Sequence, residues 1–106
     1  MILQVTTTLP TREDAERVAR ALVEDRLAAC AQVAGPIAST YWWKGQVETS
    51  TEWYCHLKTT AERFPALEAR LRTLHPYEVP EIIALPAARV AESYREWVTR
   101  ETAPGR

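Results

Sequence analysis

The hydrophobic and polar positions of this chain repeat with two periods, and each period predicts one kind of element. Residues 47–59 alternate between apolar and polar side chains, which places Cys55 on the apolar face and His56 on the polar face. A period of two is typical of a strand that buries one face. Residues 11–30 instead place apolar side chains at the i, i+3, i+4, i+7 spacing, with Thr11 in position to cap the first turn. This spacing predicts an amphipathic helix.

The remaining segments complete an α+β order. The sequence predicts further strands at residues 2–8, 29–43 and 79–86 and further helices at residues 62–74 and 88–101. A Gly-Pro pair interrupts the second of these strands, and Lys44 and Gly45 provide a tight turn after it, because glycine tolerates positive φ. The resulting order is β-α-β-β-α-β with an additional C-terminal helix. It predicts a ferredoxin-like fold in a single domain of residues 1–106.

The two central strands form a hairpin that is too long for so small a domain. The strand at residues 47–59 runs for about 12 residues, or on the order of 40 Å. A domain of this size has a radius of gyration of about 13 Å, so the hairpin is expected to project beyond its own helices. It carries five aromatic side chains: Tyr41, Trp42, Trp43, Trp53 and Tyr54. An exposed aromatic hairpin predicts self-assembly that covers it, unless a bulge bends the hairpin back over its own core.

Composition and charge exclude several classes of function. The 106 residues include 13 basic and 14 acidic ones, with a net charge of -1, so a nucleic-acid partner is not expected. No apolar run approaches the roughly 18 residues of a membrane span, and the first residues lack the features of a signal peptide. We therefore expect a cytoplasmic protein without membrane contact. With only three glycines and no GxSxG segment, the chain offers neither a phosphate-binding loop nor a nucleophile elbow, which predicts a protein that is not an enzyme.

The segment with the most candidate chemistry is LHPYEVPEI, residues 74–82. His75 carries an imidazole, which suits copper, zinc and nickel, and Glu78 and Glu81 can add carboxylate oxygens. These three residues are the predicted metal ligands. The two prolines of the segment support a structural interpretation as well, because each forces extended geometry on the residue before it. The segment is then a stiff connector between a helix and a strand.

Five segments occur in one order along the chain: LAACAQV, STYWWKGQVE, LKTT, HPYEVPEIIALP and SYREWV. With this order and spacing, the chain closely resembles the CutA divalent-cation-tolerance proteins over nearly its whole length. The resemblance implies a ferredoxin-like fold similar to that of the PII signalling proteins. It also implies a homotrimer in which the long hairpin strands pair between subunits, and a link to tolerance of copper and other divalent cations.

The resemblance also bears on the candidate metal site. Some members of the family present a cysteine at the end of the first strand and a second histidine just before the one that corresponds to His75. This chain has Thr7 and Leu74 at those positions. Of the three family positions (the cysteine, the preceding histidine and the histidine that corresponds to His75), only His75 keeps a clear metal ligand in this chain.

A second candidate site combines aromatic side chains with opposite charges. Tyr41, Trp43, Lys58, Tyr77 and Glu81 all fall in the segments that carry the resemblance. Aromatic rings with one cation and one carboxylate can hold a small anionic or zwitterionic ligand. The resemblance places such a cleft between subunits, where the same aromatic residues can instead form the trimer interface.

Three functional hypotheses follow. The leading one is a non-catalytic, trimeric protein that binds divalent cations such as copper and needs no obligatory cofactor. The second is a PII-like sensor or adaptor that binds a small metabolite in the cleft between subunits. The third is a trimeric anchor for other proteins.

Overall fold

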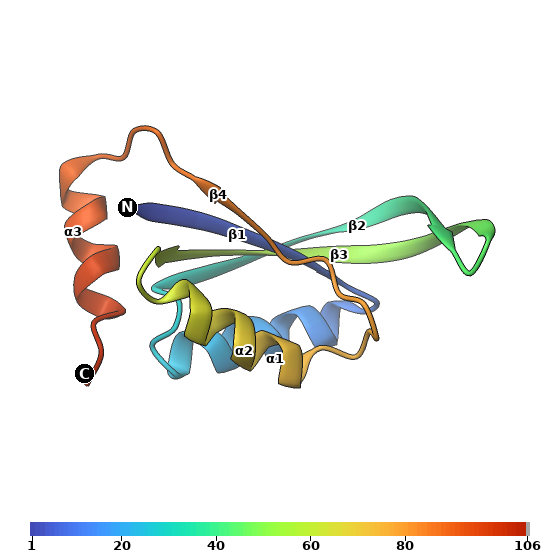
Figure 1. Cartoon of the computed structure of the whole chain (residues 1–106), viewed down its shortest axis with the longest axis horizontal. Coiled ribbons are helices and arrows are strands. Elements are labelled where there is room, and N and C mark those ends of the chain that lie inside the picture. Colours follow the sequence, from blue (N-terminus) through green and yellow to red (C-terminus); the bar gives the residue numbers. More distant parts are fainter. Residues whose placement is uncertain (106) are drawn as a thin grey trace.

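The computed structural model describes residues 1–105 and shows the predicted order of elements (Figure 1). The elements are β1 (Ile2–Leu9), α1 (Arg12–Glu24), β2 (Cys30–Trp43), β3 (Gln46–Thr60), α2 (Phe64–Leu74), β4 (Ile83–Pro86) and α3 (Glu92–Glu101). The four strands form one sheet in the order β2-β3-β1-β4, and every neighbouring pair is antiparallel. The α+β, ferredoxin-like fold with an additional C-terminal helix is thus confirmed.

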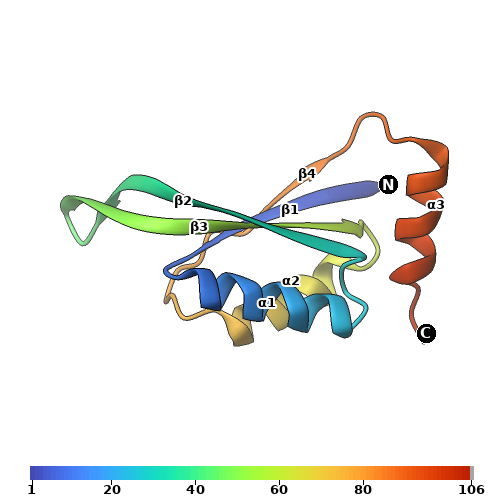
Figure 2. The same ribbon diagram turned by 180° about the vertical axis from the view of Figure 1, so that it is seen from behind.

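Helices α1 and α2 pack side by side on one face of the sheet, as Figures 1 and 2 show. The buried core between these layers consists of Val5, Leu9, Ala15, Val18, Leu22, Leu27, Ala28, Cys55, Leu57, Leu67 and Leu71. Cys55 lies on the core side of β3 and His56 on the opposite side, as the alternation predicted. Burial raises the pKa of the Cys55 thiol to about 12, so this cysteine is a neutral core residue. We call the side of the sheet away from α1 and α2 the open face.

The hairpin of β2 and β3 projects beyond the two helices (Figures 1 and 2). It gives the molecule a longest dimension of 44 Å, against 26 and 21 Å in the other directions. Lys44 and Gly45 form the predicted turn, with φ of 51° and 81°. A bulge does interrupt β2 between Ala34 and Ile37, but the hairpin stays extended beyond it. At this bulge a Cβ atom on Gly35 would lie 2.8 Å from Cε3 of Trp53, which explains the glycine.

Three predicted boundaries were wrong because tertiary contacts override local pattern. Helix α1 ends at Glu24 instead of continuing to residue 30, because Arg26 has a φ of 61° and Leu27 then turns into the core. Strand β4 begins at Ile83 instead of residue 79, since the residues before it line a cleft on the open face. Helix α3 begins at Glu92 instead of residue 88.

Helix α3 stands at the end of the sheet farthest from the hairpin turn (Figure 1). Val98 is fully buried, and the Tyr94 hydroxyl lies 3.2 Å from Sγ of Cys30. Within the described residues, no helix is long and apolar enough to cross a membrane.

Candidate functional site: an acidic, aromatic cleft on the open face

His75 fastens the end of α2 to the end of β1. Its Nδ1 accepts a hydrogen bond from the backbone N–H of Tyr77 at 3.2 Å. Nε2 therefore carries the proton, and it lies 2.9 Å from the Thr8 carbonyl oxygen and 3.0 Å from the Thr7 hydroxyl. The side chain is buried, and this burial lowers its pKa. His75 is thus a neutral imidazole that orders the connector between α2 and β4.

This arrangement bears on the predicted metal role of His75. Both ring nitrogens already have hydrogen-bond partners, so coordination would break the bond from the Tyr77 N–H or the bond to the Thr8 carbonyl. Thr7, at the position where some relatives of this type have a cysteine, supplies its hydroxyl to the same ring. Metal binding by His75 stays a prediction, and the observed contacts are those of a positioning residue.

Tyr77 carries the connector onto the open face, where its hydroxyl donates a hydrogen bond of 2.6 Å to Oε2 of Glu52. Glu52 lies on β3, opposite Ile37, and is only 7% exposed. Burial and the bond to this carboxylate together raise the pKa of Tyr77. The sequence places Glu52 on the polar face of its strand, so its burial was not predictable from alternation. The contact that covers this carboxylate involves Tyr77, which is 25 residues further along the chain.

Glu81 belongs to the same acidic group. Its residue as a whole is exposed, but partial burial of the carboxyl group and the nearby charge of Glu52 raise its pKa. His56 acts in the opposite direction and lowers the pKa of Glu81. The charge of Glu52 thus disfavours ionisation of Glu81, and a cation bound beside both carboxyl groups would offset this repulsion.

These residues line a cleft of about 990 Å³ between the hairpin and the connector. Its walls include the predicted site residues Tyr41, Trp43, Tyr77, Glu78 and Glu81, together with Thr8, Ile37, Ala38, Ser39, Thr40, Trp42, Glu48, Glu52, Tyr54, Val79 and Pro80. Lys58 is not among them, because it lies six residues beyond Glu52 on β3, opposite Cys30, where its ammonium group bonds Oε1 of Gln32 at 2.8 Å. Among the described residues that line the cleft, none is lysine, arginine or histidine. The cleft therefore suits a cation better than the anionic or zwitterionic ligand expected from the sequence.

The cleft of one chain supplies an incomplete set of metal ligands. Within residues 1–105, no three histidine, cysteine or acidic side chains are grouped closely enough to hold a metal ion. Glu52, Glu78 and Glu81 all line the cleft, but they do not form a complete ligand cluster.

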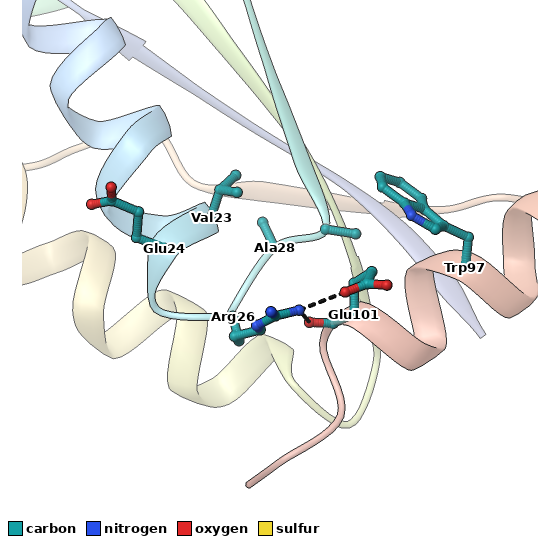
Figure 3. Close-up of a pocket in the computed structure, with 7 residues that line it drawn as sticks. Val23, Glu24, Arg26, Ala28, Trp97 and Glu101 are labelled. Carbon is teal, nitrogen blue, oxygen red and sulfur yellow. Dashed lines mark hydrogen bonds and ion pairs between the residues drawn. The ribbon is translucent and has the colours of Figure 1, made fainter. Parts of the chain in front are cut away.

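A smaller hollow of about 340 Å³ lies between α3 and the turn that follows α1 (Figure 3). Trp97 and Val23 contribute apolar walls. Nη1 of Arg26 lies 2.5 Å from Oε1 of Glu101 and also reaches the backbone carbonyl of that residue. Because its arginine is already neutralised by a carboxylate, this hollow is a packing feature that anchors α3 rather than a second charged site.

The comparisons with known proteins agree with one another. Residues 3–101 match the family model described as CutA1 divalent ion tolerance protein. The chain is 44% identical over 95 residues to the divalent-cation tolerance protein CutA of Thermus thermophilus, covering 90% of this chain and 92% of that relative. A solved structure of a divalent cation tolerance protein from Thermus thermophilus matches with a TM-score of 0.94 at 43% identity, covering 97% of this chain and 100% of that chain.

Two further relatives correct the cytoplasmic location expected from the sequence. A structure of the periplasmic divalent cation tolerance protein CutA from Archaeoglobus fulgidus matches with a TM-score of 0.92 at 34% identity, covering 96% of this chain and 99% of that chain. A rice relative, the chloroplastic Protein CutA 1, is 37% identical over 95 residues, which cover 90% of this chain and 54% of the rice protein. Related chains thus occur outside the cytoplasm, and the expectation was wrong to treat composition as a guide to compartment.

Proposed function

Since the chain belongs to the CutA1 divalent ion tolerance family, we propose that it binds divalent cations directly and without catalysis, in the acidic cleft of the open face. Glu52 and Glu81 are the proposed ligands, with Glu78 in support at the rim. His75 does not contact the cation in this proposal; it holds Tyr77 and the rest of the connector in place.

The observation that carries this proposal is the burial of Glu52. The residue is more than nine-tenths buried, and within residues 1–105 its carboxylate accepts a side-chain hydrogen bond from the neutral Tyr77 hydroxyl. No ion pair formed within residues 1–105 includes Glu52. A buried carboxylate without a counter-charge is costly, and a bound cation between Glu52 and Glu81 would offset that cost.

The donor set bears on the choice of metal. Carboxylate oxygens suit manganese and magnesium, whereas copper favours imidazole. His56 lies close enough to Glu81 to lower its pKa, and its Nδ1 bonds the Thr6 hydroxyl at 3.0 Å. Because His75 has both nitrogens engaged and His56 does not complete a three-residue ligand cluster with Glu52 and Glu81 in one chain, we propose that a neighbouring subunit supplies the imidazole donor for copper(II).

The proposed assembly is a homotrimer formed through the long hairpin strands. Support comes from the projecting hairpin and from large apolar side chains that one chain leaves exposed, such as Trp42 at 74%, Ile83 at 50% and Leu85 at 59%. Such surfaces mark interfaces. A neighbouring subunit would also supply the further donors that one cleft lacks.

Calorimetric titration of manganese(II) and copper(II) into the protein at pH 7.5 tests the ligand assignment. Glu52→Gln and Glu81→Gln are each expected to weaken binding by more than about tenfold. Glu62→Gln is the matched control, because it removes one exposed carboxylate outside the cleft and should leave the affinity unchanged. Equal affinities for all four proteins would contradict the proposal. If His75→Gln alone abolishes binding, His75 is the ligand and the assignment to Glu52 and Glu81 fails.

A further inference from the structure

The connector between α2 and β4, residues 75–82, is attached to the rest of the chain through one titratable ring. Nε2 of His75 donates a hydrogen bond to a carbonyl oxygen of β1 at 2.9 Å, and Nδ1 accepts one from the Tyr77 N–H at 3.2 Å. Pro76 and Pro80 carry no backbone N–H, so the connector has few donors with which to replace this bond. The attachment therefore depends on an unprotonated Nδ1.

Protonation of the ring would break one of these two bonds and keep the other. An imidazolium donates from both nitrogens, so a proton on Nδ1 would place two N–H donors 3.2 Å apart, where one donor and one acceptor now meet. The bond from Nε2 to the Thr8 carbonyl would remain and would gain charge assistance. The ring would thus stay on β1 while the Tyr77 N–H loses its acceptor.

Tyr77 connects this event to the acidic cleft. Its hydroxyl donates to Oε2 of Glu52 at 2.6 Å, and its backbone N–H is the group that His75 holds. Glu81 lies four residues further along the connector, and the charge of Glu52 disfavours its ionisation. Release of the Tyr77 backbone would therefore free its hydroxyl from Glu52 and let the repulsion between the two carboxylates move Glu81 away.

The groups around the ring of His75 decide where it takes up a proton. Burial is the largest influence and lowers the pKa of His75 below its ordinary value of 6.5. The Thr8 carbonyl on β1 and the charge of Glu52 on β3 favour the charged ring. On α1, Asp14 favours it as well and Arg17 opposes it. The ring is therefore neutral at pH 7.5 and becomes charged only as the pH falls below 6.5.

We propose that the connector is a pH-sensitive switch, in which protonation of His75 at Nδ1 releases the Tyr77 N–H and then separates the Tyr77 hydroxyl from Glu52. Its consequence rests on the proposed divalent-cation function: acid would release the cation, because Glu81 moves away from Glu52 with the connector. The switch itself uses only contacts inside one chain, so it requires no free surface in the assembled protein.

Amide hydrogen exchange of the metal-free full chain, measured by NMR between pH 7.5 and pH 5.0 and corrected for the intrinsic exchange rate, tests the switch. Protection of the Tyr77 amide is expected to fall at least about tenfold across this range, with a midpoint that coincides with the titration of the His75 ring. The Leu67 amide is the internal control, because it bonds the Arg63 carbonyl of α2 at 3.0 Å and should keep its protection. Constant protection of the Tyr77 amide, or a parallel loss at Leu67, would overturn the proposal.

His75→Gln is the decisive variant, because a glutamine side chain offers one amide acceptor and one amide donor but takes up no proton. It should hold the Tyr77 amide equally well at pH 7.5 and pH 5.0. His56→Gln is the matched control: the ring of His56 bonds the Thr6 hydroxyl on β1 at 3.0 Å, so the pH dependence should persist without it. Acid-dependent loss of Tyr77 protection in His75→Gln would contradict the switch. If His75→Gln does not fold, which the Leu67 amide reports, the coincidence of the two midpoints in the unaltered protein decides.

Manganese(II) titration at pH 7.5 and pH 5.5 separates the switch from the metal proposal. Between these pH values, the affinity of the unaltered protein is expected to fall at least about threefold more than that of His75→Gln, since protonation of the carboxylates weakens both proteins alike. Absence of manganese binding, with the exchange result as expected, would reject the metal site and support the switch alone. Equal losses of affinity in both proteins would overturn the control of the metal site by the switch.

Discussion

Replacing His75 with alanine is expected to lower the free energy of unfolding by about 3 kcal/mol. The substitution removes an acceptor for the Tyr77 N–H and a donor to the Thr8 carbonyl, and it leaves a cavity where a buried ring stood. Urea unfolding in the presence of a chelator measures the effect without any contribution from bound metal.

The destabilisation caused by His75→Ala should become smaller as the pH falls below 6.5. Burial in the folded state lowers the pKa of His75 below its ordinary value of 6.5, so the unfolded chain binds a proton on this ring more readily than the folded protein does. The stability that His75 contributes is thus full above pH 6.5 and is lost as the pH falls through 6.5 toward the lower folded pKa.

His56→Ala is the control for this prediction. His56 is only partly buried, and the hydrogen bond of its ring is to the Thr6 hydroxyl, so we expect a loss of about 1 kcal/mol or less. If His75→Ala costs no more than His56→Ala in the chelated protein, His75 does not fasten the connector.

Leu22→Ala is expected to destabilise the protein by about 2 to 5 kcal/mol, because it opens a cavity between α1 and the sheet. Leu22 is fully buried in the core. Thermal or urea unfolding measures the change. Leu85→Ala is the matched comparison, since Leu85 is 59% exposed in one chain. A lone chain would lose less than about 0.5 kcal/mol from this surface change.

The effect of Leu85→Ala also tests whether the protein forms a trimer. In a homotrimer that covers the open face, the cost of Leu85→Ala should be larger and should depend on protein concentration, because unfolding is then coupled to dissociation. A small loss that does not vary with concentration would contradict burial of β4 between subunits. A Leu22→Ala loss no larger than that of Leu85→Ala would contradict the position of Leu22 in the core.

The features predicted well from sequence are those that depend on neighbours along the chain. Alternation placed Cys55 in the core and His56 on the open face, and the Lys44-Gly45 pair located the hairpin turn. Thr11 caps α1 as expected, with its hydroxyl accepting a hydrogen bond from the backbone N–H of Asp14 at 3.0 Å. Each of these follows from backbone geometry over a few residues.

The candidate site was harder to predict because it depends on contacts between distant segments. Glu52 is buried where Tyr77 reaches it from the connector and donates a hydrogen bond to its carboxylate. Lys58 was expected in the cleft on the strength of its place in the matching segments, but its ammonium group bonds Gln32 instead. The acidic character of the cleft comes from Glu48, Glu52, Glu78 and Glu81, which two distant segments bring together, so no local pattern encodes it.

Glu52 and Glu81 are proposed to hold a divalent cation on the open face. The most direct test is anomalous diffraction from crystals grown with manganese(II), at a concentration that saturates binding in solution. We expect an anomalous peak within coordination distance of both carboxylates, with the His75 ring still bonded to the Tyr77 N–H and the Thr8 carbonyl. A peak on the His75 imidazole, or no peak in the cleft, would contradict the claim.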